Sequence, residues 1–64
     1  MKSKYEAIFI KLYNEGVKHD EQVGHLDSEW NRTLAKRWAS INLHHNSVDK
    51  FMAEWDEFYY HMFD

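Results

Sequence analysis

The sequence predicts an all-α fold, a small three-helix bundle whose helices run up, down and up. Apolar residues recur every three to four positions in three separate segments, which is the spacing of a helix that buries one side. Proline is absent, and Gly16 and Gly24 are the only glycines among the 64 residues, so little turn chemistry is available for a β-rich fold. A chain of this size forms a single domain, which we expect to span residues 1–64.

The first helix is expected over residues 3–15. Ser3 followed by Glu6 has the spacing of a capping box, in which the hydroxyl and the carboxylate each accept a hydrogen bond from a free backbone N–H. Gly16 is expected to end the helix, because continuing it would bring Asp20 onto the buried side. A connection of about ten residues then follows. The apolar residues of this helix are Tyr5, Ile8, Phe9, Leu12 and Tyr13.

The second helix is expected over residues 28–45. Asp27 or Ser28 can cap its N-terminus, and Glu29 lies in the first turn, where the helix dipole favours an anion. Spacings of four, four and three residues define the side that we expect to be buried. Its members are Trp30, Leu34, Trp38 and Ile41.

The third helix is expected over residues 47–63 and has the most regular apolar pattern of the three. Asn46 or Ser47 can cap it. Because only these two residues separate it from the second helix, the two helices should form an antiparallel hairpin. Its expected buried residues are Val48, Phe51, Met52, Trp55, Phe58, Tyr59, Met62 and Phe63.

Composition argues against several classes of protein. No apolar run approaches the roughly 20 residues that span a bilayer. Eight Lys and Arg against eleven Asp and Glu give a net charge of −3, which argues against a dedicated domain for binding nucleic acid duplexes. Cysteine is absent, which fits a reducing compartment, so we expect a cytoplasmic protein. The sequence has no nucleophile elbow and no phosphate-cradling glycine loop, so we expect neither enzymatic activity nor a cofactor.

Histidines raise the question of a metal site. The five are His19, His25, His44, His45 and His61, and their spacings are not those of common zinc ligands. The expected topology gathers His19, His25 and His61 at one end of the bundle, where they could bind a metal ion or form a pH-sensitive surface. Solvated histidines are the simpler alternative, and we predict no metal.

Basic residues on the second helix suggest an alternative function. Arg32 and Lys36 are four residues apart and share a face, with Arg37 nearer the apolar edge. A basic face beside Trp38 could contact phosphate and stack a base, as in a small nucleic-acid-associated regulator. Three basic residues are a weak footprint, however, and a local ion pair between Glu29 and Arg32 is a sufficient explanation.

Several apolar residues lie outside the expected buried sides. Ile10 and Val17 widen the apolar face of the first helix beyond what a bundle helix needs. Leu43 is expected to point away from the buried side of the second helix, and Tyr60 and His61 away from that of the third. Contiguous exposed apolar surface is typical of a site that binds a partner. We therefore predict that these five residues bind a protein partner.

The predicted function is that of a non-enzymatic helical module that binds and modulates a larger protein, self-associates as a dimer, or does both. Self-association would give so small a bundle additional core. Short, cysteine-free, aromatic-rich chains are similar to the products of small bacterial and bacteriophage open reading frames, which often act on larger proteins. That similarity implies a small regulatory protein.

Overall fold

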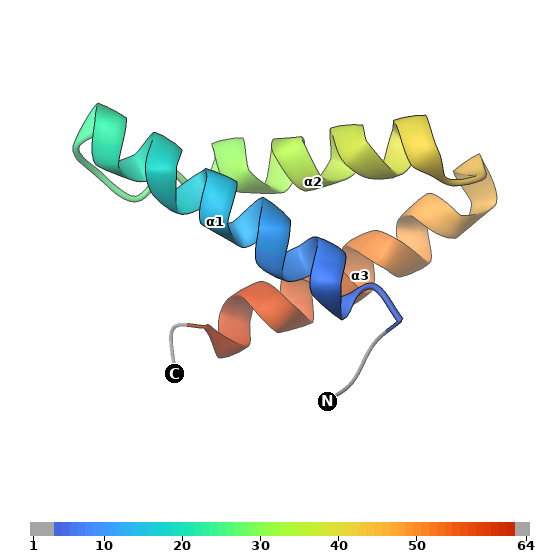
Figure 1. The fold of residues 1–64 in the computed structure, drawn as a ribbon. Coiled ribbons are helices and arrows are strands. Elements are labelled where there is room, and N and C mark those ends of the chain that lie inside the picture. The colour runs from blue at the N-terminus through green and yellow to red at the C-terminus, as the bar shows by residue number, and fades with distance from the viewer. Residues whose placement is uncertain (1–3, 63–64) are drawn as a thin grey trace.

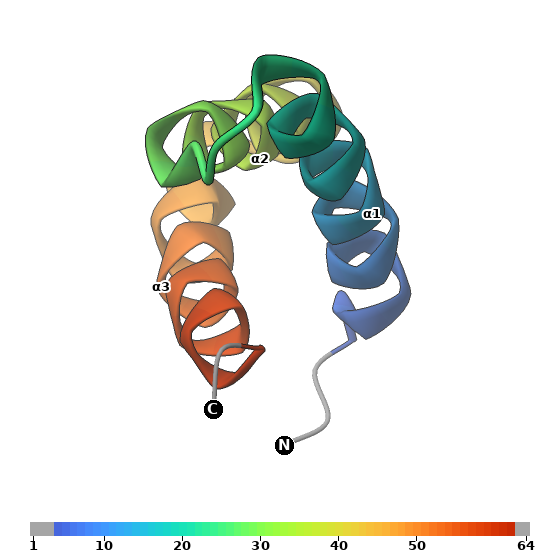
Figure 2. The same cartoon turned by 90° about the vertical axis from the view of Figure 1, so that its left-hand side faces the viewer.

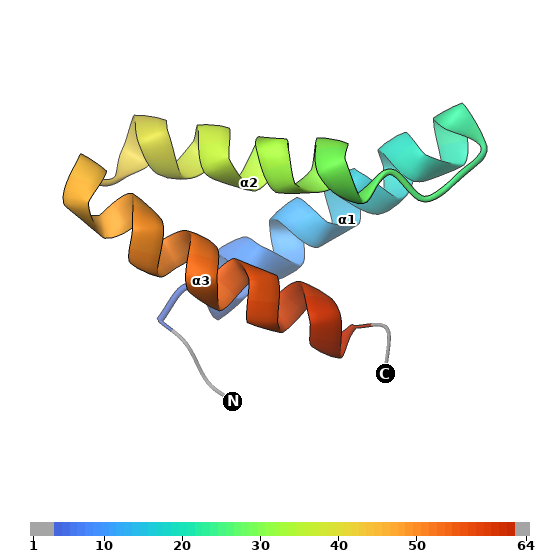
Figure 3. The ribbon, with the colours of Figure 1, turned by 180° about the vertical axis from the view of Figure 1, so that it is seen from behind.

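The computed structural model describes residues 4–62, which form three α-helices. They are α1, Glu6–Val23; α2, Ser28–Asn42; and α3, His45–His61. α2 runs opposite to α1 and α3, as Figures 1 and 3 show from opposite sides. The prediction of a small all-α bundle with up-down-up topology is therefore confirmed.

The three helices form an arch in which α2 lies across the top (Figure 2). α2 packs against both other helices, whereas α1 and α3 touch each other along a shorter contact. The ring of Phe9 lies where α1 meets α3. Its centroid is 5.1 Å from that of Phe51, 5.7 Å from that of Trp55 and 5.4 Å from that of Phe58. Ring pairs at such distances each contribute about 1 kcal/mol beyond the burial of their surface. The buried core consists of Phe9, Leu12, Ala35, Ala39, Val48, Phe51, Met52 and Trp55.

α1 is longer than predicted, and the prediction that it ends at Gly16 is wrong. It begins at Glu6 and continues to Val23, so the connection to α2 has four residues instead of about ten. Its C-terminus is made by Gly24, whose φ of 82° is the left-handed conformation that glycine adopts without strain. The N–H groups of Gly24 and His25 both bond to the carbonyl of Asp20, at 2.9 and 3.2 Å. Ser3, the proposed cap, lies outside the described residues.

Gly16 has a different role, because it lies in the middle of α1 and faces Asn31 of α2. The side chain of Asn31 packs directly against it, and Asn31 is only 3% exposed. A Cβ atom built on Gly16 would lie 2.6 Å from Cγ of Asn31 and closer still to its Oδ1. The glycine therefore provides room for a buried amide.

The buried side of α2 also differs from the prediction. Asn31, Ala35 and Ala39 face the core, whereas Trp30 lies partly in solvent and Ile41 is 75% exposed. Small residues face the core here because α2 is packed between two helices, and alanine lets both backbones approach. Leu34 and Trp38 are half-buried against the core, as expected.

The turn between α2 and α3 has the predicted length but a different position. It consists of Leu43 and His44, both in extended conformations, instead of Asn46 and Ser47. His44 takes the N-cap position without a side-chain bond, and the side chain of Asn42 donates to the carbonyl of Trp38 at 2.9 Å. Leu43 packs against the core instead of pointing away from it, so that expectation is wrong.

The predicted face of α3 is the most accurate part of the sequence analysis. Val48, Phe51, Met52 and Trp55 are buried, and Phe58 and Tyr59 pack against them. Met62 differs, since 46% of it is exposed. Phe63, also expected in the core, lies outside the described residues.

Candidate protein-interaction surface

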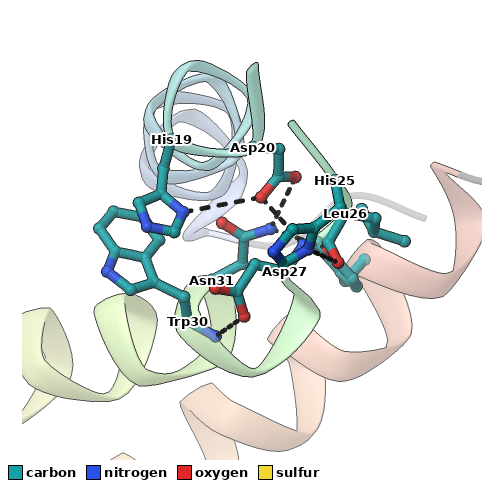
Figure 4. Close-up of polar contacts among 8 residues, drawn as sticks. His19, Asp20, His25, Leu26, Asp27, Trp30 and Asn31 are labelled. Atoms are coloured by element: carbon teal, nitrogen blue, oxygen red, sulfur yellow. Dashed lines mark hydrogen bonds and ion pairs between the residues drawn. The ribbon is translucent and has the colours of Figure 1, made fainter. Parts of the chain in front are cut away.

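A polar cluster joins all three helices at the end of the bundle that holds the α1–α2 connection. Figure 4 shows its members from α1, the connection and α2. Asp20 of α1 accepts from the backbone N–H of Asp27 at 3.1 Å and from the amide of Asn31 at 3.3 Å. The same amide nitrogen donates to the hydroxyl of Tyr59 on α3, at 2.9 Å. Asp27 in turn accepts from the N–H of Trp30 at 3.1 Å and caps α2, as the sequence predicted. Asp20 therefore fixes the start of α2 as well as the position of Asn31.

Burial changes the acidity of the phenol in this cluster. Loss of contact with water raises the pKa of Tyr59, because the charged phenolate is disfavoured. The hydrogen bond from Asn31 acts in the opposite direction and is the weaker of the two effects. Tyr59 therefore remains neutral and serves as a packing and hydrogen-bonding group.

His19 lies beside this cluster and stacks on Trp30. Their rings are parallel within 2° and their centroids are 3.7 Å apart. Nδ1 of His19 is 3.8 Å from a carboxylate oxygen of Asp20, which is beyond hydrogen-bonding distance. The stack gives the partly exposed Trp30 a structural contact with α1.

The histidines expected to gather at this end occupy three separate environments. His19 stacks on Trp30, His25 lies with Nδ1 3.1 Å from the carbonyl of Leu26, and His61 lines the space between α1 and α3. Within residues 4–62, no group of three or more His, Cys, Asp or Glu side chains is placed to share a metal ion.

The basic residues of α2 do not form one continuous face. Arg32 makes two bonds to the carboxylate of Asp56, at 2.9 and 3.1 Å, instead of pairing with Glu29. The hollow that contains Arg32 and Lys36 also contains Asp49 and Asp56, so its charges balance. Arg37 lines a different hollow, beside Trp30.

An apolar groove of about 170 Å³ lies between α1 and α3. No residue of α2 lines it. Phe9, Phe58 and Met62 supply its apolar surface, and Glu6, Glu54, Glu57 and His61 surround it. α2 lies on one side of the contact between α1 and α3 (Figure 2), so among residues 4–62 the groove is lined by these two helices and Met62 without α2.

The residues predicted to bind a partner are divided between this groove and its surroundings. His61 lines the groove. Ile10 and Val17 are exposed on α1. They lie four and eleven residues after Glu6, about one and three helical turns, so they are on the same side of α1 as Glu6. Tyr60 is 78% exposed and lines a second hollow with Leu26. Leu43, half-buried against the core, has the least accessible side chain of the five predicted residues.

Sequence reasoning missed two parts of this surface. Met62 was assigned to the core, but it is exposed in the groove. Leu26, 59% exposed, was placed in the connection between the first two helices and not considered as a binding residue. Helical periodicity says nothing about how α1 and α3 are placed relative to each other. That placement is what shows that Met62 lies in the groove between them.

None of the helices in residues 4–62 combines the length and apolar character that crossing a bilayer requires. Comparison with protein-family models, with curated proteins and with solved structures found no match.

Proposed function

We propose that this chain is a non-enzymatic protein-interaction module that binds a larger protein through the groove between α1 and α3. The observation that carries the proposal is the apolar surface of Phe58 and Met62, which α2 leaves uncovered. Exposed apolar surface with a polar rim is typical of a protein-binding site. A module of this kind modulates its partner by occluding or reshaping the surface to which it docks.

The size of the groove supports a binding function more than a catalytic one. At about 170 Å³ it is smaller than the roughly 300–1,000 Å³ of a typical small-molecule site. Its apolar side chains and charged rim suit a segment of a protein partner. The lack of cysteine is compatible with work in the cytoplasm, the setting we propose for a small bacterial or bacteriophage regulator.

Two variants test the assignment of the groove. Met62→Lys places a charge in the groove, and Ile41→Lys places the same charge at an exposed apolar position on α2. Both should fold, because both side chains are already in contact with solvent. We expect Met62→Lys to abolish capture of a specific protein from native extract at high salt, and Ile41→Lys to retain it.

Equal capture by the two variants and the original chain would refute the role of the groove. Light scattering over a range of concentrations distinguishes the remaining possibility. A mass that doubles with concentration in the original chain and not in Met62→Lys would make a second copy the occupant.

A further inference from the structure

In the part of the chain that the structure describes, the rim of the groove between α1 and α3 carries fixed charges of a single sign. Glu6 contributes a carboxylate from α1, and Glu54 and Glu57 contribute two from α3. Among residues 4–62, none of those that line the groove is Lys or Arg. The lysines and arginines of α2 lie in hollows that the groove does not share. The groove therefore combines an apolar floor with an anionic rim, although the net charge of the whole chain is only −3.

We propose that the occupant of this groove is a cationic amphipathic helix of a partner protein. This inference rests on the proposed function and adds the chemistry of the partner. One or two apolar side chains of that helix dock on Phe58 and Met62. Lysines or arginines three to four residues away reach the carboxylates of Glu6 and Glu57 on either side, because this spacing places them on the same face of a helix.

Both sides of the groove carry charge, which defines the geometry of the partner. Glu6 lies on α1, and Glu57 lies on α3 across the apolar floor. A helix lying in the groove would therefore meet a carboxylate on each flank, as in the general arrangement of an apolar seam with charged edges. Ile10 extends the apolar part of α1 by one turn beyond Glu6. The apolar contacts provide most of the affinity, whereas the carboxylates raise the association rate and favour a cationic partner over an anionic one.

A second copy of this chain fits the groove less well. A symmetric dimer pairs the same surface of both protomers. Pairing through the groove would bring two sets of Glu6, Glu54 and Glu57 together, and opposed like charges are destabilising. A nucleic acid is disfavoured for the same reason, since its phosphates would face the carboxylates.

Three synthetic peptides provide the test. The first is an amphipathic helix of leucines flanked by lysines, the second has glutamates in place of the lysines, and the third has serines in place of the leucines. Binding is followed by tryptophan fluorescence, and the contact surface is located by backbone amide shifts in NMR. We expect the leucine–lysine peptide alone to bind, with shifts on α1 and α3 around Glu6, Phe58 and Met62.

A pair of double variants isolates the charge of the rim. Glu6→Gln with Glu57→Gln removes two carboxylates from the groove. Glu21→Gln with Glu29→Gln removes two exposed carboxylates elsewhere, and it is closely matched, because Glu6 and Glu29 both lie in the first turn of a helix. We expect the first pair to weaken binding of the leucine–lysine peptide about five- to tenfold, and the second pair to change it less than about twofold.

The outcomes separate this inference from the function on which it rests. Equal binding of the glutamate peptide, or equal weakening by the two double variants, would refute the cationic partner while leaving the groove as a docking site. If Met62→Lys binds the leucine–lysine peptide as well as the original chain does, the groove itself is not the site. If the difference in peptide affinity between the original chain and the Glu6→Gln, Glu57→Gln variant disappears at high salt, the carboxylates are supported as the selective element.

Discussion

Gly16→Ala is the substitution for which the structure makes the least intuitive prediction. In most helices this change stabilises the fold by about 1 kcal/mol, because alanine is the better helix former. Here the new Cβ would lie 2.6 Å from Cγ of Asn31, where an ordinary contact needs at least 3.4 Å. Asn31 is almost fully buried, so its side chain can move only by leaving its partners.

The cost follows from the bonds that Asn31 would lose. Its amide donates to the hydroxyl of Tyr59 and to the carboxylate of Asp20. A neutral hydrogen bond contributes about 1 kcal/mol and one to a charged group about 1.5 kcal/mol or more. After the helical gain of alanine is subtracted, Gly16→Ala should destabilise the protein by about 1.5 kcal/mol. In a domain of this size that loss lowers Tm by roughly 6–12 °C.

Urea unfolding followed by circular dichroism measures this change, and a double-mutant cycle with Asn31→Ala supplies the control. When Asn31 is already alanine, the clash is removed and Gly16→Ala should become stabilising by about 1 kcal/mol. The coupling between the two positions is then about 2.5 kcal/mol. A Gly16→Ala protein as stable as the original, or a cycle with no coupling, would refute the close packing of Asn31 on Gly16.

Three further predictions concern the other polar contacts. Asp20→Ala should lower the free energy of unfolding by about 2 kcal/mol in urea titrations, because two donors lose a charged acceptor. A double-mutant cycle between Arg32 and Asp56 should give less than about 1 kcal/mol at low salt and less still at high salt, since both side chains are about half exposed. Since the pKa of Tyr59 is raised above its usual 10.0 by burial, the folded state holds this proton more tightly than the unfolded chain. The resulting stability is fully present below about pH 10 and is lost as pH rises through the folded pKa, so the original chain should lose more stability than Tyr59→Phe between about pH 9 and pH 11.

Each of these has a result that would contradict it. Asp20→Ala with unchanged stability would mean that solvent replaces the carboxylate. Salt-independent coupling between Arg32 and Asp56 would point to a contact less exposed than the structure shows. Tyr60→Phe, at an exposed position on the same helix, is the control for Tyr59→Phe, and identical alkaline behaviour of the two variants would exclude a special role for Tyr59.

The sequence was sufficient for the fold class and for the face of α3 from Val48 to Tyr59, because that helix buries large apolar residues at regular spacing. It was misleading where polar residues are buried. Asp20 was treated as a reason to end the first helix, yet its carboxylate is satisfied by Asp27 and Asn31. Asn31 belongs to α2 and Asp27 is the N-cap of that helix, so no helical pattern around Asp20 reveals them.

The error in α2 has a related origin. Periodicity identifies the side with the largest apolar residues, which here includes Trp30 and Ile41. The side that is actually buried carries Ala35 and Ala39, because the helix is packed between two neighbours and needs small residues there. On such a helix, the side with the largest apolar residues and the side that packs most closely are different.

The candidate site was only partly accessible to sequence reasoning. The exposure of Ile10, Val17 and Tyr60 was foreseen from their positions outside the apolar stripes. The groove was not, because its carboxylates come from both ends of the sequence. Glu6 and Glu57 are brought together by the arch, and their shared charge becomes visible only with the tertiary structure.

The two-residue turn formed by Leu43 and His44 has a consequence for how the chain folds. Closing so short a loop costs little entropy, and closing the four-residue connection between α1 and α2 costs only about 0.6 kcal/mol more. Because α2 and α3 also share the more extensive contact, we expect this hairpin to pair first, before α1 has found its place. α1 then docks across a longer separation in sequence, guided by Phe9 and completed by the contact of Gly16 with Asn31. On this order of events, changes within the α2–α3 hairpin slow folding, whereas changes at Gly16 mainly accelerate unfolding. The residues that decide how quickly the bundle forms are thus different from those that decide how long it lasts.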